Sequence, residues 1–480
     1  MSRGFGQSSG RTPKSSATAK AAEVFYLAFA HHRLGRLEEA IAHYRQALQL
    51  APDYTDAHFA LGVALQAKGG LDEAGRHLQK TLKLNPNHVD AHFTLSTVLQ
   101  AQGKHDEAVR HLQKALRLRP DHAKAHNNLG VLFKEQGRLD EAVLHYCEAL
   151  RFEPDFADAH NNLGIALKGQ GKFNEAILHY RQSLRSQPDA AETHYNLGLA
   201  LQATGNLSEA LESYQNALQQ LEFAEAHFGV GSVLKDQGRF DEAAASYRQA
   251  LQLRPDFAEA QHYLAVVGGV PLPDAASPEY VTMLFDGYAE RFDHHLTETL
   301  SYRTPEFLHR AVVAVMARDQ LLKVMDLGCG TGLCGSLFRP LAHTLIGVDL
   351  SAQMVDKARS RAVYDHLIVG DMQTCLLAAQ SGFDLILAAD VFVYVGHLLP
   401  IFQASFAALC EGGHFAFSVE AVEDEPYTLL PNGRFAHSIA YVRQTSIAAG
   451  FAEVSVESAV LRTENARPIR GHIVLLCRMA

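Results

Sequence analysis

The sequence predicts two folds in one chain: an all-α array of repeated helix pairs, then an α/β domain whose mainly parallel sheet ends in an antiparallel strand. Three observations predict this organisation. The same small residues return every 34 positions between residues 21 and 257. Short apolar runs alternate with helical stretches between residues 278 and 480. A glycine-rich turn follows the first of those apolar runs.

Three residue types mark the period of the array. Alanines stand at Ala40, Ala74, Ala108, Ala142, Ala176, Ala210 and Ala243, glycines at Gly35, Gly69, Gly103, Gly137, Gly171, Gly205 and Gly238, and prolines at Pro52, Pro86, Pro120, Pro154, Pro188 and Pro255. In each unit the glycine ends one helix, the alanine lies where two helices cross, and the proline stops the second helix. One pair cannot bury its apolar face alone, so the seven units over residues 21–257 must stack into a superhelix. This period is typical of tetratricopeptide repeats (TPR).

Short segments flank the array. Residues 1–20 are rich in Ser and Gly and contain no acidic residue, which predicts a disordered tail. Residues 258–267 begin another first helix and then stop, which predicts a capping helix. The Gly- and Pro-rich stretch that follows predicts a linker, so that residues 258–277 connect the array to the second domain, residues 278–480.

Composition excludes several classes of protein. The 480 residues carry a formal net charge of -10 at pH 7, which argues against a general nucleic-acid binder, because phosphate binding requires clustered Lys and Arg. No apolar run reaches the roughly 18 residues that span a bilayer, and the N-terminus lacks the apolar segment of a secretory signal. The six cysteines are scattered without a CxxC pair. We therefore expect a cytoplasmic protein with no membrane segment and no metal site.

The second domain contains seven apolar runs. They cover residues 322–328, 343–349, 366–371, 383–390, 414–420, 452–461 and 471–479. Strands that alternate with helices predict a parallel sheet covered by helices. Only residues 462–470 join the last two runs, which is too short for a helical crossover. Those two strands should therefore pair antiparallel.

The first run leads into Asp326-Leu327-Gly328-Cys329-Gly330-Thr331-Gly332. Glycines let the backbone approach a ligand closely, and the N-terminus of the following helix offers free N–H groups. The spacing is GxGxG, with an acidic residue two positions before the first glycine. This combination resembles motif I of the class I methyltransferases that use S-adenosylmethionine (AdoMet), and it implies a Rossmann-like domain.

The resemblance implies a cofactor site at the carboxyl ends of the strands, where open α/β sheets bind ligands. Asp349 ends the second run, where a carboxylate can accept hydrogen bonds from a ribose diol, and Asp371 ends the third, where it can accept from the adenine amino group. Met354 could pack on the adenine, and Tyr288 shares a helical face with Phe292 if that segment is helical. The expected cofactor residues are Asp326, Gly328, Cys329, Gly330, Gly332, Asp349, Leu350, Met354, Asp371, Met372, Asp390 and Tyr288.

Over the whole chain the sequence resembles a bacterial group of predicted methyltransferases fused to N-terminal TPR repeats. Residues 285–293, 300–305 and 433–438 are similar to that group. The fourth run lacks the Asn/Asp-Pro-Pro-Tyr pattern of many amino-group methyltransferases, which favours an oxygen, carboxylate or small-molecule acceptor and leaves its identity open. Candidate catalytic residues are His437, Tyr441, Arg434 and Tyr394. For His437, which follows a long loop, capping the next helix is an equal alternative.

Asn128, Asn162 and Asn196 share one position in consecutive first helices, where they should face the concave groove. Asparagines in a row can hydrogen-bond an extended peptide backbone, and this arrangement resembles the TPR region of O-linked N-acetylglucosamine transferases. We expect the array to recruit a protein and the second domain to methylate it or a molecule that it carries. Two alternatives stay open: a TPR scaffold whose methyltransferase fold is inactive, and a small-molecule methyltransferase whose repeats serve assembly.

Overall fold

The computed structural model describes residues 16–289, 292–294, 296, 300–316, 321–379, 382–464 and 467–479. It divides into two compact units, Met1–Glu222 and Phe223–Ala480, so the last helix pair of the array belongs to the same unit as the α/β domain. Residues 1–15 of the predicted tail, and Glu290 and Arg291 of the segment 285–293, lie outside the described residues. The first helix begins at Ser16, inside the predicted tail. The domain boundaries drawn from the sequence stay predictions.

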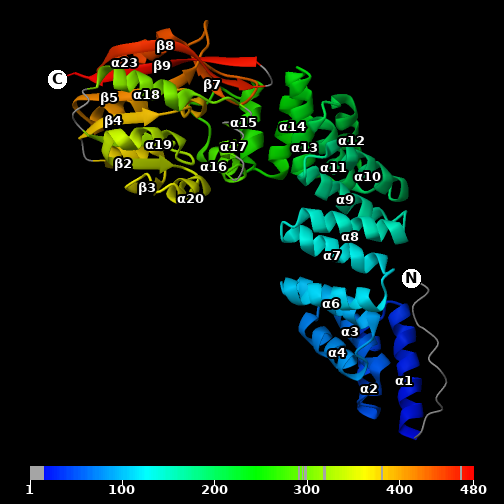
Figure 1. The fold of residues 1–480 in the computed structure, drawn as a ribbon. Coiled ribbons are helices and arrows are strands. Elements are labelled where there is room, and N and C mark those ends of the chain that lie inside the picture. Colours follow the sequence, from blue (N-terminus) through cyan, green and yellow to red (C-terminus); the bar gives the residue numbers. More distant parts are fainter. Residues whose placement is uncertain are drawn as a thin grey trace. The chain divides into compact units, whose positions relative to one another are not determined.

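The predicted array of helix pairs is confirmed, with helices following one another in chain order (Figure 1). The helices are α1 (Ser16–Arg33), α2 (Leu37–Leu50), α3 (Thr55–Ala67), α4 (Leu71–Leu84), α5 (Val89–Ala101), α6 (His105–Leu118), α7 (Ala123–Glu135), α8 (Leu139–Phe152), α9 (Ala157–Gly169), α10 (Phe173–Ser186), α11 (Ala191–Ala203), α12 (Leu207–Gln220), α13 (Ala224–Asp236), α14 (Phe240–Leu253) and α15 (Ala258–Val266). The turn inside each pair needs a left-handed residue, as at Gly69 (φ +85°), which explains the periodic glycine.

Each of four later repeats buries a tyrosine from its second helix against a glycine of its first. In one repeat, an added Cβ at Gly164 would lie 2.5 Å from the ring of Tyr180. The same contact recurs for Gly130, Gly198 and Gly231 with Tyr146, Tyr214 and Tyr247. Because the first helix has no side chain at this position, the tyrosine ring packs directly against its backbone, and the two helices lie close together.

Four consecutive repeats also contain a half-buried histidine pair. In the first, the Nδ1 atoms of His58 and His77 lie 2.9 Å apart, and His58 Nε2 donates to the carbonyl of Pro52 at 2.9 Å. Since the Nε2 of His58 carries its proton, its Nδ1 accepts the hydrogen bond from His77. The equivalent pairs are His92–His111, His126–His145 and His160–His179, at 2.9, 3.1 and 3.0 Å. The periodic histidines therefore join the two helices of a repeat.

We expect the array to lose stability as the pH falls below about 6.5. Burial, and then the charge of the partner ring, lowers the pKa of His77, His111, His145 and His179 in the folded state. Because the unfolded chain binds protons at higher pH than the folded chain, stability is complete above the unfolded pKa and falls on acidification. Thermal unfolding followed by circular dichroism between pH 7.5 and 5 should show the midpoint falling by about 5 °C or more. A midpoint that stays constant over this pH range would contradict the stabilising role of the neutral histidine pairs.

The second unit contains a seven-stranded sheet in the order β3-β2-β1-β4-β5-β9-β8. Its strands are β1 (Leu322–Leu327), β2 (Ala342–Asp349), β3 (His366–Val369), β4 (Phe383–Ala388), β5 (Leu409–Glu420), β8 (Phe451–Glu464) and β9 (Arg467–Arg478). The pairs from β3 to β5 are parallel, whereas β9 pairs antiparallel with both β5 and β8. The prediction that the last two strands pair antiparallel is confirmed.

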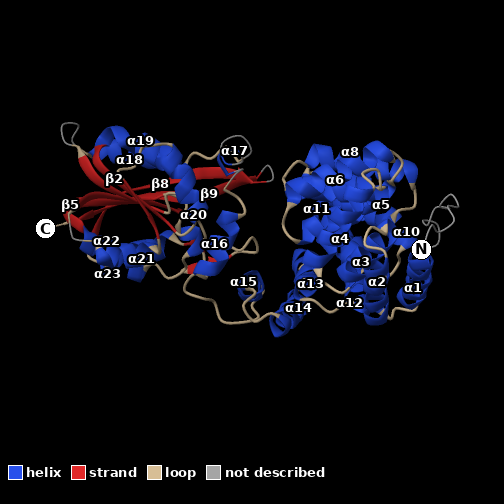
Figure 2. Cartoon of the chain, turned by 90° about the horizontal axis from the view of Figure 1, so that it is seen from below, coloured by secondary structure: helices blue, strands red, loops and turns tan. Residues whose placement is uncertain are grey.

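Helices cover both faces of the sheet, with α18 and α19 on one face and α21, α22 and α23 on the other (Figure 2). The elements outside the sheet are α16 (Pro278–Asp286), α17 (Phe292–His294), α18 (Thr304–Val315), α19 (Leu333–Phe338), η2 (Arg339–Leu341), α20 (Ala352–Ser360), α21 (Met372–Ala378), η3 (Phe392–Tyr394), α22 (Leu399–Ala408) and α23 (Ile439–Ala448). Each face has its own apolar core, one around Leu308 and Phe338 and the other around Phe402 and Phe415.

The stretch between β5 and α23 differs from the predicted long loop. It contains a small hairpin, β6 (Tyr427–Leu429) and β7 (Phe435–His437). Ser438 caps α23 by accepting a hydrogen bond from the backbone N–H of Tyr441, so His437 does not cap that helix. Within the described residues, the helices are all too short or too polar to cross a membrane.

Candidate functional site

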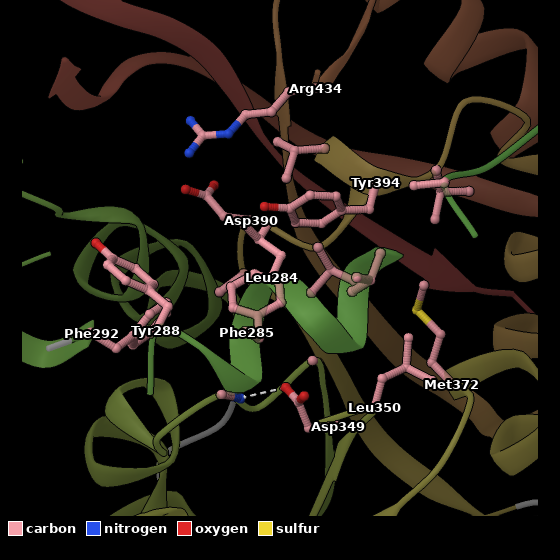
Figure 3. Close-up of a pocket in the computed structure, with 18 of the residues that line it drawn as sticks. Leu284, Phe285, Tyr288, Phe292, Asp349, Leu350, Met372, Asp390, Tyr394 and Arg434 are labelled. Atoms are coloured by element: carbon pink, nitrogen blue, oxygen red, sulfur yellow. Dashed lines mark hydrogen bonds between the residues drawn. The ribbon is translucent and has the colours of Figure 1, made fainter. Parts of the chain in front are cut away.

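A cavity of about 530 Å³ opens at the carboxyl ends of β1, β2 and β4 (Figure 3). Its lining is mostly apolar and aromatic. The side chains of Leu284, Phe285, Tyr288 and Phe292 enter it from α16, α17 and the segment between them. Among the charged groups of the lining, Asp349 lies at one side, and Asp390 and Arg434 lie at the other. The cavity can therefore bury a ligand with two polar ends.

The glycine-rich turn after β1 forms the floor beside Asp349. Gly328 and Gly330 line the cavity with φ of +62° and +53°, a conformation that favours glycine. The backbone N–H of Gly330 donates to Asp349 Oδ2 at 2.9 Å, and that of Ser351 donates to Oδ1 at 2.9 Å. Burial raises the pKa of Asp349, while these backbone hydrogen bonds oppose the rise. The backbone N–H of Leu350 also interacts with this carboxylate, which lines the cavity, where a ligand hydroxyl can reach it.

The cavity continues past Leu350 to the start of α21. Asp371 caps this helix by accepting from the backbone N–H of Thr374 at 2.8 Å, and Met372 lies beside it. Other expected cofactor residues lie outside the cavity lining, as far as the described residues define it. They are Asp326, Cys329, Gly332 and Met354.

Asp326 lies beneath the glycine-rich turn and is almost completely buried. Tyr364 donates to its Oδ2 at 2.7 Å, and burial raises the pKa of Asp326 to about 7. Its Oδ1 has no hydrogen-bond partner among the residues that the structure describes. A buried acceptor without a partner requires a water molecule or a ligand group. Cys329, Gly332 and Met354 are buried as well.

The segment from α16 to α17 is tied to the turn by polar contacts. Ser351 donates to Asp286, and Thr331 and Arg361 both donate to Asp293. Tyr288 and Phe292 were predicted to share one helical face. The structure places them in different segments, because α16 ends at Asp286, but their rings still meet edge to face with centroids 5.5 Å apart. This segment forms the cavity wall opposite the sheet.

A buried ion cluster forms the other polar end. Arg462, which is 3% exposed, donates to Asp390 Oδ2 at 3.0 Å and also pairs with Glu420 and Glu464. Asp390 has a φ of +56°, and its Oδ1 accepts from Ser418 at 2.7 Å. Such backbone strain is typical of functional sites, where the surrounding bonds maintain it.

Arg434 extends this cluster into the cavity. Its Nη1 pairs with Glu464, and its guanidinium also hydrogen-bonds the side chain of Tyr394. The guanidinium lies beside Asp390 and the hydroxyl of Tyr394 (Figure 3). Burial raises the pKa of Tyr394, so its hydroxyl is neutral near pH 7 and can donate a hydrogen bond.

The other two candidate catalytic residues lie behind this wall. His437 is completely buried, its Nε2 donates to the Gly396 carbonyl at 3.1 Å, and burial lowers the pKa of His437 to about 4. The hydroxyl of Tyr441 accepts from the backbone N–H of Leu398 at 3.0 Å. In the described part of the chain, neither residue lines the cavity. Their bonds hold the loop after Tyr394, so Arg434 and Tyr394 are the two of the four candidates that line the cavity.

The asparagines in the array are linked to neighbouring side chains. Asn162 Nδ2 donates to Asn127 Oδ1 at 3.0 Å, and Asn127 Nδ2 lies 3.4 Å from Asn128 Oδ1. Asn196 Oδ1 accepts from Lys168 at 3.1 Å. Asn196 is buried at 7% exposure, whereas Asn128 and Asn162 are partly exposed and keep some hydrogen-bonding capacity. Nowhere among the described residues do three His, Cys, Asp or Glu side chains converge as metal ligands do.

Family models match both parts of the chain. A "TPR repeat" model matches residues 30–69 and 231–267. One "Tetratricopeptide repeat" model matches residues 53–121 and again 87–152, and another matches residues 161–225. A "Methyltransferase domain" model matches residues 324–413, which contain the glycine-rich turn, Asp349, Asp371 and Asp390.

Individual relatives resemble parts of the chain. The malonyl-[acyl-carrier protein] O-methyltransferase of Enterobacter lignolyticus is 31% identical over 124 residues, which are 25% of this chain and 49% of the relative. The 18S rRNA (guanine-N(7))-methyltransferase of Bos taurus is 25% identical over 123 residues, 23% of this chain and 44% of the relative. The chain thus spans about half or less of the length of these relatives. A solved structure of Pseudomonas aeruginosa pilF is 26% identical and covers 44% of this chain and 96% of its own, with a TM-score of 0.41.

Proposed function

Because the chain joins TPR repeats to a methyltransferase domain, we propose that it transfers a methyl group from AdoMet to an acceptor at the Arg434 end of the cavity. The observation that carries the proposal is the pair of Gly330 and Asp349 at the cavity floor. A left-handed glycine backbone there donates to a half-buried carboxylate that lines the cavity. This is what a ligand with a ribose diol requires.

The residues present fit this cofactor. An added Cβ at Gly328 would lie 2.5 Å from the side chain of Val391, so this position of the floor has no room for a side chain. Asp349 would accept from the ribose hydroxyls, Asp371 from the adenine amino group, and Met372 would pack on the base. When bound, AdoMet supplies a methyl group that its sulfonium has already activated. The protein's task is then to place the acceptor and to exclude water.

The acceptor end supports a positioning role. Arg434 and Tyr394 both line this end of the cavity, where their side chains can hydrogen-bond an oxygen atom of an acceptor. Asp390 is engaged by Arg462 and Ser418, so it acts as the support of this wall. The two relatives are named for an oxygen and for a guanine nitrogen acceptor, and the apolar lining favours an acceptor with an uncharged body.

We infer that the repeats recruit the acceptor or its carrier through the groove asparagines. A variant with Asn128, Asn162 and Asn196 all changed to alanine should keep its AdoMet affinity, because these residues belong to the first unit. It should transfer labelled methyl to macromolecules of a cell extract at least about tenfold more slowly, since several backbone hydrogen bonds are lost. The substitution Gln46→Ala, at an exposed position on α2, serves as a control for the array. Unchanged transfer by the triple variant would contradict recruitment through these residues.

Calorimetric titration tests the cofactor site itself. The purified chain should bind AdoMet and its demethylated product S-adenosylhomocysteine with one-to-one stoichiometry. If the wild-type chain does not bind AdoMet, the proposal is refuted and a TPR scaffold with an inactive methyltransferase fold is favoured.

A further inference from the structure

The hairpin that carries Arg434 packs against the end of the repeat array, within the second unit. Residues 430–434 form its turn, closed by hydrogen bonds of 2.8 Å from Leu430 N to Arg434 O and from Gly433 N to Leu430 O. His262 of α15 donates from Nε2 to the Gly433 carbonyl at 2.8 Å. The residue beside Arg434 is therefore bonded to the last helix of the array.

His262 is itself held from a second side. Its ring stacks on Tyr280 of α16 with centroids 4.0 Å apart and planes 14° apart, and both rings are 5% exposed. Gly433 has a φ of +83°, and an added Cβ there would lie 3.2 Å from His262 Nε2. The donor and the carbonyl are thus both removed from water, so losing one leaves the other without a partner at a full desolvation cost.

The last complete repeat reaches the same turn. Lys235 of α13 donates to the Pro431 carbonyl at 3.2 Å. Apolar contacts extend the junction, because Ala265 shares a buried cluster with Leu429 and Phe435 of the hairpin. Three separate kinds of contact therefore connect α13 and α15 with β6, β7 and the turn between them.

The repeat pattern identifies what the turn contacts. Lys235 occupies the repeat position of Lys168, which donates to Asn196, two repeats later. His262 occupies the repeat position of Asn161, the residue before Asn162, three repeats later. The turn thus meets the end of the array at positions equivalent to those beside the proposed peptide-binding asparagines.

We propose that His262 is a positioning residue: it holds the 430–434 turn so that Arg434 faces the acceptor end of the cavity, and it thereby couples the last repeat to methyl transfer. This coupling rests on the proposed function, in which Arg434 contacts the methyl acceptor. The residues proposed to hold AdoMet follow β1, β2 and β3, so cofactor affinity should be independent of His262.

Hydrogen–deuterium exchange of the full chain tests the contact directly. In His262→Ala, the amides of Leu430 and Gly433 should exchange about tenfold faster than in the wild type, because the turn opens locally. His262→Gln, which retains an N–H donor, should restore part of the protection. The matched control is Gln261→Ala on the same helix, which removes an exposed bond to the Pro255 carbonyl and should leave the turn unchanged. Equal protection in His262→Ala and the wild type would overturn the inference.

A double-mutant cycle tests the coupling to Arg434. The probe is transfer of labelled methyl from AdoMet into total cell extract. His262→Ala and Arg434→Ala should each slow transfer, and the double variant should lose no more than Arg434→Ala alone. Fully additive losses would show that His262 does not act through Arg434. If the wild type failed to bind AdoMet while His262→Ala still opened the turn, methyl transfer would be refuted and the positioning of the turn upheld.

Discussion

Arg462→Ala is expected to lower the free energy of unfolding of the α/β domain by about 3–5 kcal/mol. The guanidinium is almost completely buried, and its partners are Asp390, Glu420 and Glu464. Without it, Arg434 is the one cation that still pairs with these carboxylates among the residues that the structure describes. Pulse proteolysis across a urea series, with peptides of residues 278–480 identified by mass spectrometry, measures the change.

An exposed ion pair on the same sheet provides the control. Arg310 pairs with Glu457 of β8, and both side chains are about half exposed, so Arg310→Ala should cost less than about 1 kcal/mol. A combined Arg462→Ala and Glu420→Gln variant should recover part of the loss, because one buried charge is removed. Similar losses for Arg462→Ala and Arg310→Ala would show that the cluster does not support the cavity wall.

Asp349→Ala is expected to weaken AdoMet binding by about 100-fold, the equivalent of nearly 3 kcal/mol for charge-assisted hydrogen bonds. The substitution removes the acceptor proposed for the ribose and also leaves the N–H of Gly330 and Ser351 without their partner. Calorimetry at matched protein concentration checks the affinity. Asp356→Ala removes the same charge from the exposed side of α20 and should leave binding unchanged. Retained affinity in Asp349→Ala would place the cofactor elsewhere.

Much of the fold could be predicted because its information is local. The periodic glycine and proline end helices wherever they occur, as Gly69 does between α3 and α4. The short link between the last two apolar runs excludes a crossover, and so it determines their antiparallel pairing. The glycine-rich turn and Asp349 were identified by spacing, and the structure brings them into contact.

The acceptor end could not be predicted in the same way. Arg462, Glu420 and Glu464 lie at the ends of strands that are distant in sequence, and each alone is typical of a solvent-exposed residue. Only the pairing of β5, β9 and β8 brings them together. His437 had the residue type of a base, but its burial and its bond to Gly396 depend on a hairpin that no periodicity indicated.

The most direct test of the account follows the methyl group itself. Purified chain, AdoMet labelled on the methyl group and a cell extract should together yield one labelled acceptor species, with an equal amount of S-adenosylhomocysteine. Asp349→Ala should abolish this label, and Asp356→Ala should leave it unchanged. AdoMet binding without any label in the extract, or equal label with Asp349→Ala, would contradict the claim that this cavity transfers methyl groups.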